Sequence, residues 1–266
     1  MLRKPTHQNP KQPEKHNNKN YRHSAIRQIH IQTSKLPFKG RENLMIPKII
    51  HYCWYGYSTP PKMYERCIAS WKQHLPEYKI QRWDLSNTDL SSPFLKNCFQ
   101  KKHWAFISDY IRMKALHQYG GIYLDCDMEI IKDISPLLNN DCFLGYESKD
   151  RPTSGIIGCI QGHSLPKACM EIIDDRFKRR MPYLIAPEVV IQALSGNTES
   201  ERICIYEEEY FYPYNPYDQN RKNESLMYAD ITENTYAIHH WGKSWSQSLR
   251  TRALKKTMDL LRKKPI

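Results

Sequence analysis

The stretch of chain that decides the fold reads WAFISDYIRMKALHQYGGIYLDCD, from Trp104 to Asp127. Its first sixteen residues carry apolar side chains at helical spacing, which predicts a helix over residues 104–119 with a wide apolar face. Gly120 and Gly121 follow, and glycine is the residue that most readily ends a helix in a left-handed conformation. Residues 122–124 are apolar and predict a short buried strand. This strand leads directly into two acidic residues, Asp125 and Asp127.

The Asp125-x-Asp127 pair indicates a metal site. In extended chain, residues i and i+2 point to the same side, so both carboxylates can face one ion. Carboxylate oxygens suit hard divalent cations such as Mg²⁺ or Mn²⁺, which often bridge a protein to substrate phosphates. A bare D-x-D is a weak signal, because such a pair is often a solvated turn. Its place after a buried strand, where α/β sheets bind ligands, strengthens the prediction.

Further from this stretch, strand-like and helix-like segments alternate, which predicts a single α/β domain. Short β-branched or aromatic runs indicate strands, and longer runs with helical periodicity indicate helices. The expected strands are residues 48–54, 78–83, 122–124 and 156–160, and the expected helices are residues 61–74, 104–119, 165–178 and 188–194.

The net charge of +12 is concentrated near the two ends of the chain. Residues 1–44 carry ten Lys and Arg against two Glu, with few apolar residues, which predicts a disordered basic tail. The α/β domain is expected over residues 45–246, and residues 247–266 predict a basic amphipathic helix. Residues 45–266 hold 30 basic and 26 acidic side chains, a near balance that argues against nucleic acid as a partner. The terminal helix either packs on the domain or lies on an anionic membrane surface.

The cysteines and the hydropathy indicate a cytoplasmic protein. None of the eight cysteines forms a C-x-x-C pair, so reduced, buried thiols are expected rather than a disulfide framework or a thiolate zinc site. No apolar run approaches the roughly 20 residues that span a bilayer, and the N-terminus lacks a secretory signal. The predicted location is therefore the cytoplasm, including the inner face of the membrane.

Three motifs in the right order resemble a known family. They are the run from Phe106 to Asp127, the opening IPKIIHYCWYG from Ile46 to Gly56, and the closing TENTYAIHHW with the later Ser244-Trp245. Together they resemble the glycosyltransferase family with a sugar-binding region containing the DXD motif. That family includes bacterial capsular and polysaccharide glycosyltransferases and yeast initiating mannosyltransferases, and it is similar to the glucosylating domain of clostridial toxins. The resemblance covers about residues 46–246 and implies a GT-A-like, Rossmann-like fold.

The resemblance also implies roles for residues upstream of the D-x-D motif. Trp54 would flank the nucleobase of the donor, although a tryptophan on an apolar strand is more often part of the core. Asp109 and Arg112 would contact the donor sugar and its ribose or phosphate region, with Tyr123 nearby. From spacing alone, Asp109 and Arg112 lie three apart on one helix face, where a local ion pair is the simpler interpretation.

For the metal centre itself, the resemblance implies that Asp127 is the direct ligand and that Asp125 contacts both metal and ribose. His239 or His240 would complete the coordination of Mn²⁺ or Mg²⁺. We favour His240 slightly. The simpler alternative is two histidines without a role in binding, one pointing inward and one outward. Trp245 would bind a phosphate through its indole N–H.

These expectations together predict a metal-dependent, retaining glycosyltransferase. It would move a sugar from a UDP- or GDP-sugar to a polysaccharide, lipid-linked or other glycan acceptor, as in capsule or polysaccharide biosynthesis. Asp125, Asp127 and Arg112 would carry the catalysis, because the metal and Arg112 stabilise charge on the leaving diphosphate. Three alternatives stay open: an effector that glycosylates host proteins, a metal-dependent phosphohydrolase or nuclease, and a non-catalytic surface-binding protein.

Overall fold

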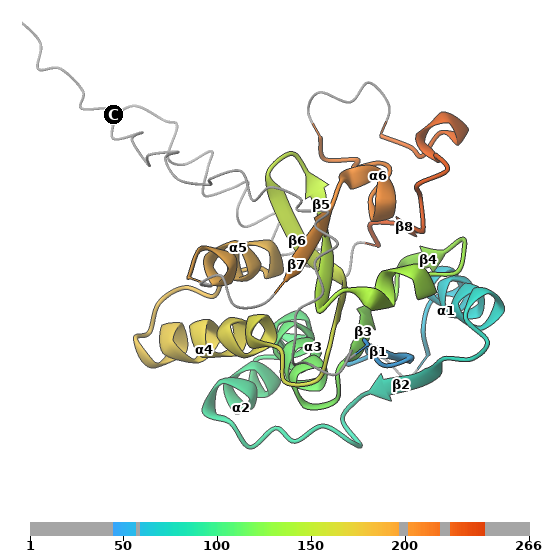
Figure 1. Ribbon diagram of the computed structural model, residues 1–266. Coiled ribbons are helices and arrows are strands. Elements are labelled where there is room, and N and C mark those ends of the chain that lie inside the picture. The colour runs from blue at the N-terminus through green and yellow to red at the C-terminus, as the bar shows by residue number, and fades with distance from the viewer. Residues whose placement is uncertain (1–44, 57–58, 197–201, 219–223, 243–266) are drawn as a thin grey trace, which may run out of the picture. The chain divides into compact units, whose positions relative to one another are not determined.

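The computed structural model describes residues 45–56, 59–196, 202–218 and 224–242, which form one α/β unit (Figure 1). The predicted α/β class is therefore confirmed. The expected basic tail at residues 1–44 and the expected helix at residues 247–266 lie outside the described residues, as does Trp245.

A six-stranded sheet forms the centre of the unit, with the strand order β2-β1-β3-β6-β5-β7. Strand β6 is antiparallel to both of its neighbours, and the other strand pairs are parallel, so five of the six strands run in one direction. A separate pair, β4 with β8, is antiparallel. The strands are β1 (Ile49–Cys53), β2 (Lys79–Trp83), β3 (Gly121–Leu124), β4 (Met128–Ile130), β5 (Cys142–Ser148), β6 (Arg151–Cys159), β7 (Ile203–Tyr206) and β8 (Ala237–His239).

The sheet separates two hydrophobic cores, because side chains alternate between its faces. Tyr123 packs into one core and its neighbours Ile122 and Leu124 into the other. Helices α2 to α5 cover the first face, and α1, α6 and the β4–β8 pair cover the second (Figure 1). The helices are α1 (Lys62–His74), α2 (Pro93–Gln100), α3 (Trp104–Tyr119), α4 (Ser164–Lys178), α5 (Ala186–Gly196) and α6 (Glu208–Phe211), with 3-10 turns η1 (Ser135–Asn139) and η2 (Tyr228–Asp230).

The passage from α3 to β3 forms as its sequence predicts. Helix α3 covers the expected residues, and Gly120 and Gly121 follow with φ angles of 64° and 101°. Any side chain here would also collide with neighbouring backbone. A Cβ on Gly120 would lie 2.7 Å from the amide nitrogen of Gln161, and one on Gly121 would lie 2.6 Å from the carbonyl oxygen of Ile49. The two glycines thus allow a tight reversal that brings β3 directly against β1.

The cysteines are free, as predicted, and six of the eight are buried. Burial raises the pKa of the Cys53 thiol to about 12 and that of the Cys169 thiol to about 12, which keeps both protonated and unreactive. No helix within the described part of the chain is both long and apolar enough to cross a bilayer.

Candidate metal centre

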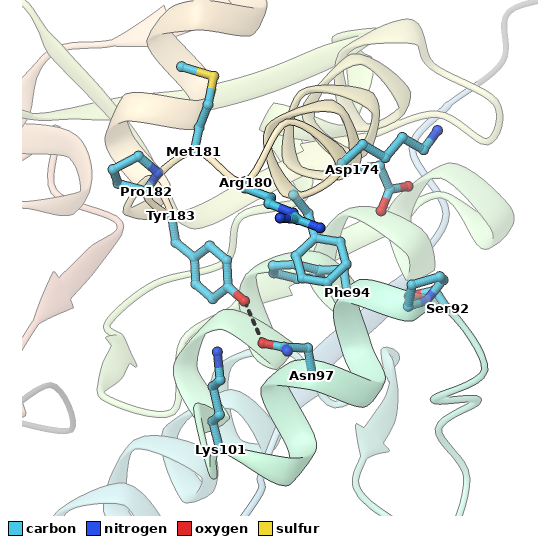
Figure 2. Close-up of a pocket in the computed structure, with 12 residues that line it drawn as sticks. Ser92, Phe94, Asn97, Lys101, Asp174, Arg180, Met181, Pro182 and Tyr183 are labelled. Carbon is cyan, nitrogen blue, oxygen red and sulfur yellow. Dashed lines mark hydrogen bonds between the residues drawn. The ribbon is translucent and has the colours of Figure 1, made fainter.

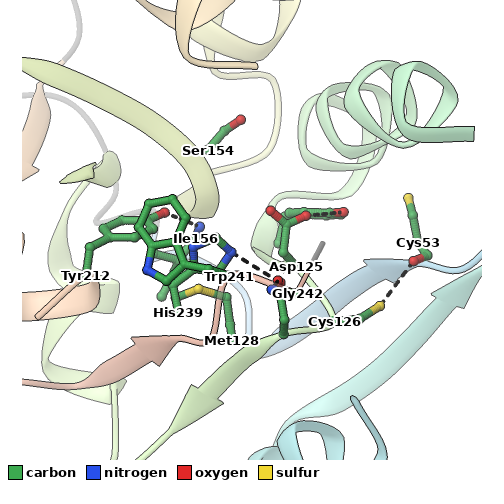
Figure 3. Close-up of polar contacts among 12 residues, drawn as sticks. Cys53, Asp125, Cys126, Met128, Ser154, Ile156, Tyr212, His239, Trp241 and Gly242 are labelled. Carbon is green, nitrogen blue, oxygen red and sulfur yellow. Dashed lines mark hydrogen bonds and ion pairs between the residues drawn. The ribbon is translucent and has the colours of Figure 1, made fainter. Parts of the chain in front are cut away.

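Three side chains that could hold a metal ion meet just beyond the C-terminal end of β3: Asp125, Asp127 and His239. Figure 3 shows Asp125 and His239. One ligand atom from each lies within 4.8 Å of the others. Within the set, Nε2 of His239 lies 3.3 Å from Oδ1 of Asp127. Two carboxylate oxygens and an imidazole nitrogen form a donor set that fits a divalent cation of the Mn²⁺ type.

The backbone fixes the two carboxylates by hydrogen bonds at both ends of the D-x-D segment. The N–H of Asp125 donates to the carbonyl of Gly155 on β6 (2.8 Å), and its carbonyl accepts from the N–H of Met128 (3.0 Å). The Asp125–Met128 bond closes a tight turn, so Asp125 and Asp127 are held on either side of Cys126. The Cys126 thiol turns away and donates to the carbonyl of Cys53 (3.2 Å).

The third ligand comes from β8, which pairs with β4 immediately after the D-x-D segment. Met128 lies opposite His239 in this antiparallel pair, and the N–H of His240 donates to the carbonyl of Asp127 (2.9 Å). The side chain of Asp127 is also bound to this segment, because its Oδ2 accepts from the N–H of Gly242 (2.7 Å). The strand pairing therefore sets the position of the histidine relative to both carboxylates.

The structure brings His239 to the cluster, whereas the sequence analysis favoured His240. Successive side chains of a strand point to opposite sides. His239 points inward, where its ring packs against Trp241 (centroids 4.4 Å apart). His240 points to the other side, and its Nε2 lies 2.6 Å from Oε2 of Glu129. The pairing register that decides between the two is a long-range property that the sequence does not display.

Asp127 and His239 perturb each other electrostatically. Burial acts to raise the pKa of Asp127, but the imidazole of His239 and the N–H of Gly242 outweigh it and hold that pKa below its usual value. Burial acts to lower the pKa of His239, and the carboxylate of Asp127 outweighs it and raises that pKa. Without a cation, the pair is thus stabilised as an ionised carboxylate beside a protonated imidazole. A bound metal ion would replace that proton.

Asp125 is oriented by two buried side chains. Its Oδ1 accepts hydrogen bonds from Nη2 of Arg112 (3.0 Å) and from the hydroxyl of Tyr123 (3.1 Å). Arg112 also donates through Nη1 to the carbonyl of Ser154 (2.7 Å), and its guanidinium lies over the Tyr123 ring, 4.4 Å from the centroid. The side chain of Asp125 is 28% exposed against 5% for Arg112, so only the carboxylate reaches the open side of the site.

Asp109 lies behind Arg112 and is buried without a hydrogen bond to either carboxylate oxygen. Oδ1 is 2.9 Å from Nη2 of Arg112, which makes the local ion pair expected from their spacing. Burial nevertheless exceeds the attraction of the guanidinium and raises the pKa of Asp109 to about 7. A carboxyl group with unused acceptors and a near-neutral pKa, next to a substrate site, is a candidate for contact with a polar ligand.

The remaining predicted residues take different places. Trp54 follows β1 at the same end of the sheet, where its ring meets Tyr64 edge-on (5.4 Å) and is 9% exposed. Tyr64 in turn lies against Gly242, since a Cβ there would be 2.6 Å from the tyrosine hydroxyl oxygen. Trp54 is therefore close to the cluster, in a largely buried position.

Two aromatic side chains also contact the His239 ring: Tyr212, which sequence reasoning did not single out, and Trp241, for which it left packing and function equally open. Tyr212 accepts from the N–H of Ile156 (3.1 Å) and meets the His239 ring edge-on (5.6 Å) (Figure 3). Trp241 has a φ of 53° and donates its indole N–H to the carbonyl of Tyr214 (2.8 Å). The clustering of Tyr and Trp over residues 206–241 was the available signal, but it did not reveal which rings face the site.

Comparison with known proteins agrees with this geometry. Residues 61–144, which include the D-x-D segment, match the family model described as glycosyltransferase sugar-binding region containing DXD motif. An uncharacterized glycosyltransferase, L373, of Acanthamoeba polyphaga mimivirus is 27% identical over 229 residues, covering 77% of this chain and 86% of that protein. Inositol phosphoceramide mannosyltransferase 3 of Schizosaccharomyces pombe is 27% identical over 151 residues, covering 54% of this chain and only 42% of the yeast protein. Among solved structures, the galactosyltransferase LgtC in complex with donor and acceptor sugar analogues is 12% identical, with a TM-score of 0.45, covering 80% of this chain and 94% of that one.

The chain is therefore similar in sequence to glycosyltransferases, both across the D-x-D region and over most of the length of the mimivirus protein. The resemblance predicted from the sequence is confirmed by the family match, which runs from the start of α1 into β5 and includes α3, β3 and the D-x-D segment. The arrangement of the sheet agrees with the α/β architecture that this resemblance implies: a mostly parallel sheet delivers the D-x-D segment from the end of a central strand.

Proposed function

We propose that the chain is a metal-dependent, retaining glycosyltransferase that uses a nucleotide-diphosphate sugar as donor. The observation that supports this most directly is the convergence of Asp125, Asp127 and His239 at the end of β3. A divalent ion held there would neutralise the charge that develops on the nucleoside diphosphate as its bond to the sugar breaks. We propose Mn²⁺ over Mg²⁺, because an imidazole ligand suits Mn²⁺ better than it suits the oxygen-preferring Mg²⁺.

The residues around that ion have different roles in holding it. Asp127 and His239 are tied to each other and to the β8 segment, so they form the rigid part of the ligand set. Asp125 is the adjustable part, held through one oxygen and partly exposed, and we propose that its other oxygen faces both the ion and the donor ribose. Arg112 and Tyr123 act as positioning residues for Asp125, because both are buried and directed at its carboxylate.

We propose that Asp109 contacts the donor sugar. A buried carboxyl group with a pKa of about 7 and no hydrogen bond to either oxygen can accept from a sugar hydroxyl without first breaking an internal bond. Trp54 flanks the nucleobase in this arrangement, and Trp245, outside the described residues, supplies an indole N–H to a phosphate. These roles rest on the family resemblance together with the placement of Trp54 beside Tyr64.

For the acceptor we propose a glycan or a lipid-linked sugar. One relative is named as an inositol phosphoceramide mannosyltransferase, which supports a lipid-linked acceptor. The eight free thiols support the predicted cytoplasmic location. A host protein as acceptor would use the same donor site, so an acceptor screen distinguishes these cases.

The decisive experiment measures nucleotide binding and donor cleavage in parallel. UDP or GDP should raise the melting temperature only when Mn²⁺ is present, and Asp127→Asn should abolish that increase. Glu65→Gln, an acid-to-amide change at an exposed site on α1, is the matched control and should behave like wild type. If neither nucleotide changes the melting temperature in the presence of metal, the proposal is wrong.

Incubation with a panel of UDP- and GDP-sugars then identifies the reaction. A glycosyltransferase that transfers slowly to water releases a nucleoside diphosphate and a free sugar. A phosphohydrolase would instead cleave within the diphosphate and release a nucleoside monophosphate. Retention is tested by NMR of the first-formed product, whose anomeric configuration should equal that of the donor.

A further inference from the structure

A groove of about 910 Å³ lies between α2, the C-terminal half of α4 and the turn that follows α4 (Figure 2). Phe94 and Phe177 contribute apolar surface, and the hydroxyl of Tyr183 crosses to α2, where it donates to Oδ1 of Asn97 (2.8 Å). Its lining also includes three cations, Lys101, Lys178 and Arg180. All three are exposed.

The charge of this face is opposite to that of the rest of the domain. The residues that line the groove include three cations, Lys101, Lys178 and Arg180, against one acidic residue, Asp174, a net charge of +2. Residues 45–242 as a whole hold 22 Lys and Arg against 25 Asp and Glu, a net charge of −3. The carboxylate of Asp174 is already engaged, because it accepts from the hydroxyl of Tyr110 (3.0 Å). The face therefore attracts anions although the domain around it is acidic.

Large apolar side chains are exposed on the same segments. Phe99 at the end of α2 is 42% exposed, and Met181 and Ile185 after α4 are 41% and 38% exposed. Cations interspersed with exposed apolar side chains are typical of surfaces that bind the interface of an anionic bilayer. A soluble anion would be recognised by the cations alone and would leave these apolar side chains in water.

The groove also adjoins the donor side of the catalytic centre. Phe94 and Tyr183 line both the groove and a small neighbouring cavity, and Asp109 lines that cavity from the side of α3. The rings of Phe94 and Tyr183 would thus separate a headgroup in the groove from the Asp109–Arg112 pair. An acceptor anchored in the same bilayer would be close to the catalytic centre.

We propose that this groove and its rim bind the surface of an anionic phospholipid bilayer, with an anionic headgroup in the groove and the side chain of Met181 at the acyl boundary. The proposal does not depend on the donor chemistry inferred above. It assigns membrane contact to the folded domain rather than to the basic segments at the ends of the chain.

The test is sedimentation of the full chain with vesicles of phosphatidylcholine alone or mixed with phosphatidylglycerol. A triple variant, Lys101→Gln with Lys178→Gln and Arg180→Gln, should bind the anionic vesicles at least about tenfold more weakly than wild type, because each juxtamembrane cation contributes on the order of 1 kcal/mol. The matched control neutralises three exposed lysines elsewhere, Lys62→Gln with Lys79→Gln and Lys149→Gln, and should bind like wild type.

Two further measurements separate this surface from its alternatives. The variant Met181→Ser should weaken the binding that remains in high salt, where charge attraction is screened. Both groove variants should keep the wild-type melting temperature and nucleotide-sugar hydrolysis, which shows that they fold. Equal vesicle binding by the two triple variants, equal binding to neutral and anionic vesicles, or binding to a soluble polyanion without binding to vesicles would each overturn the proposal.

Discussion

Replacing each of the two adjacent histidines with alanine gives the sharpest test of the metal centre. His239 supplies the imidazole of the cluster, whereas His240 is directed at Glu129 on the other side of the β4–β8 pair. His239→Ala should therefore weaken Mn²⁺ binding severely, and His240→Ala should leave it nearly unchanged. The two substitutions are chemically identical and one residue apart, so each serves as the control for the other.

The size of the effect follows from linkage between binding and folding. At a metal concentration one hundred times the dissociation constant, a bound ion stabilises the folded state by about 2.7 kcal/mol. For a domain of roughly 200 residues, this raises the melting temperature by about 5–10 °C. Mutation of residues that only orient metal ligands typically lowers metal affinity about 10- to 100-fold. Removal of a direct ligand should therefore weaken metal binding on the order of 100-fold. The same metal concentration then stabilises His239→Ala by only about 0.4 kcal/mol, or about 1 °C.

The assay is differential scanning fluorimetry with a Mn²⁺ titration, together with UDP or GDP. The measured quantity is the metal-induced change in melting temperature of each variant relative to its own metal-free state. His239→Ala also loses stability because its contact with the Trp241 ring disappears. Comparing each variant with its own metal-free state excludes this loss from the measured effect of the metal. Full metal-induced stabilisation in His239→Ala, combined with its loss in His240→Ala, would refute the ligand assignment.

Three further outcomes are expected from the packing and the electrostatics of the domain. Tyr212→Phe removes the acceptor of the buried Ile156 N–H and should lower the free energy of unfolding by about 1–3 kcal/mol in urea denaturation. Gly158→Ala should cost about 1–3 kcal/mol or more, because its Cβ would lie 2.2 Å from the Phe143 ring. Asp109→Asn should abolish transfer, and its stability relative to wild type should rise by about 2 kcal/mol between pH 5 and pH 8. The sign follows because burial raises the folded-state pKa of Asp109 to about 7. At pH 5 the folded wild type therefore keeps a proton on Asp109 that the unfolded chain has lost, and this difference stabilises the folded wild type. The stabilisation disappears as the pH rises through 7.

Each of these outcomes has a clear contrary result. Urea curves of Tyr212→Phe that overlay those of wild type would mean that the Ile156 N–H has another acceptor. An unchanged melting temperature in Gly158→Ala would mean that the Phe143 ring moves aside. A pH-independent stability difference for Asp109→Asn would show that Asp109 is ionised throughout, as a fully effective ion pair with Arg112 requires.

The parts of the fold that the sequence predicted are those governed by local interactions. Helix α3 has its periodicity and its glycine stop within one continuous stretch, and the D-x-D segment follows at once. The strands that were missed or shortened depend on their neighbours instead. Residues 151–155 include Pro152 and Gly155 and do not read as a strand, yet they are the first part of β6, which lies between β3 and β5.

The same distinction holds within the candidate site. The Asp109–Arg112 pair was expected from its spacing on one helix and is present at 2.9 Å. The other partners of Arg112 are Asp125, thirteen residues away, and Ser154, forty-two residues away, and neither contact follows from local pattern. These contacts support the proposal that Arg112 orients Asp125.

Strand β8 has a consequence for how the enzyme becomes active during its synthesis. The segment that carries His239 binds the D-x-D motif across 115 residues of chain, through the Gly242 N–H and the Asp127 carboxylate. While a nascent chain is still short of β8, the central sheet can already form, but its two carboxylates lack both the imidazole and the backbone donor that hold Asp127 in place. Metal affinity, and any activity that depends on it, would therefore arise only after the ribosome has released this last strand. Arrested or prematurely terminated chains would remain inactive even where their core is folded.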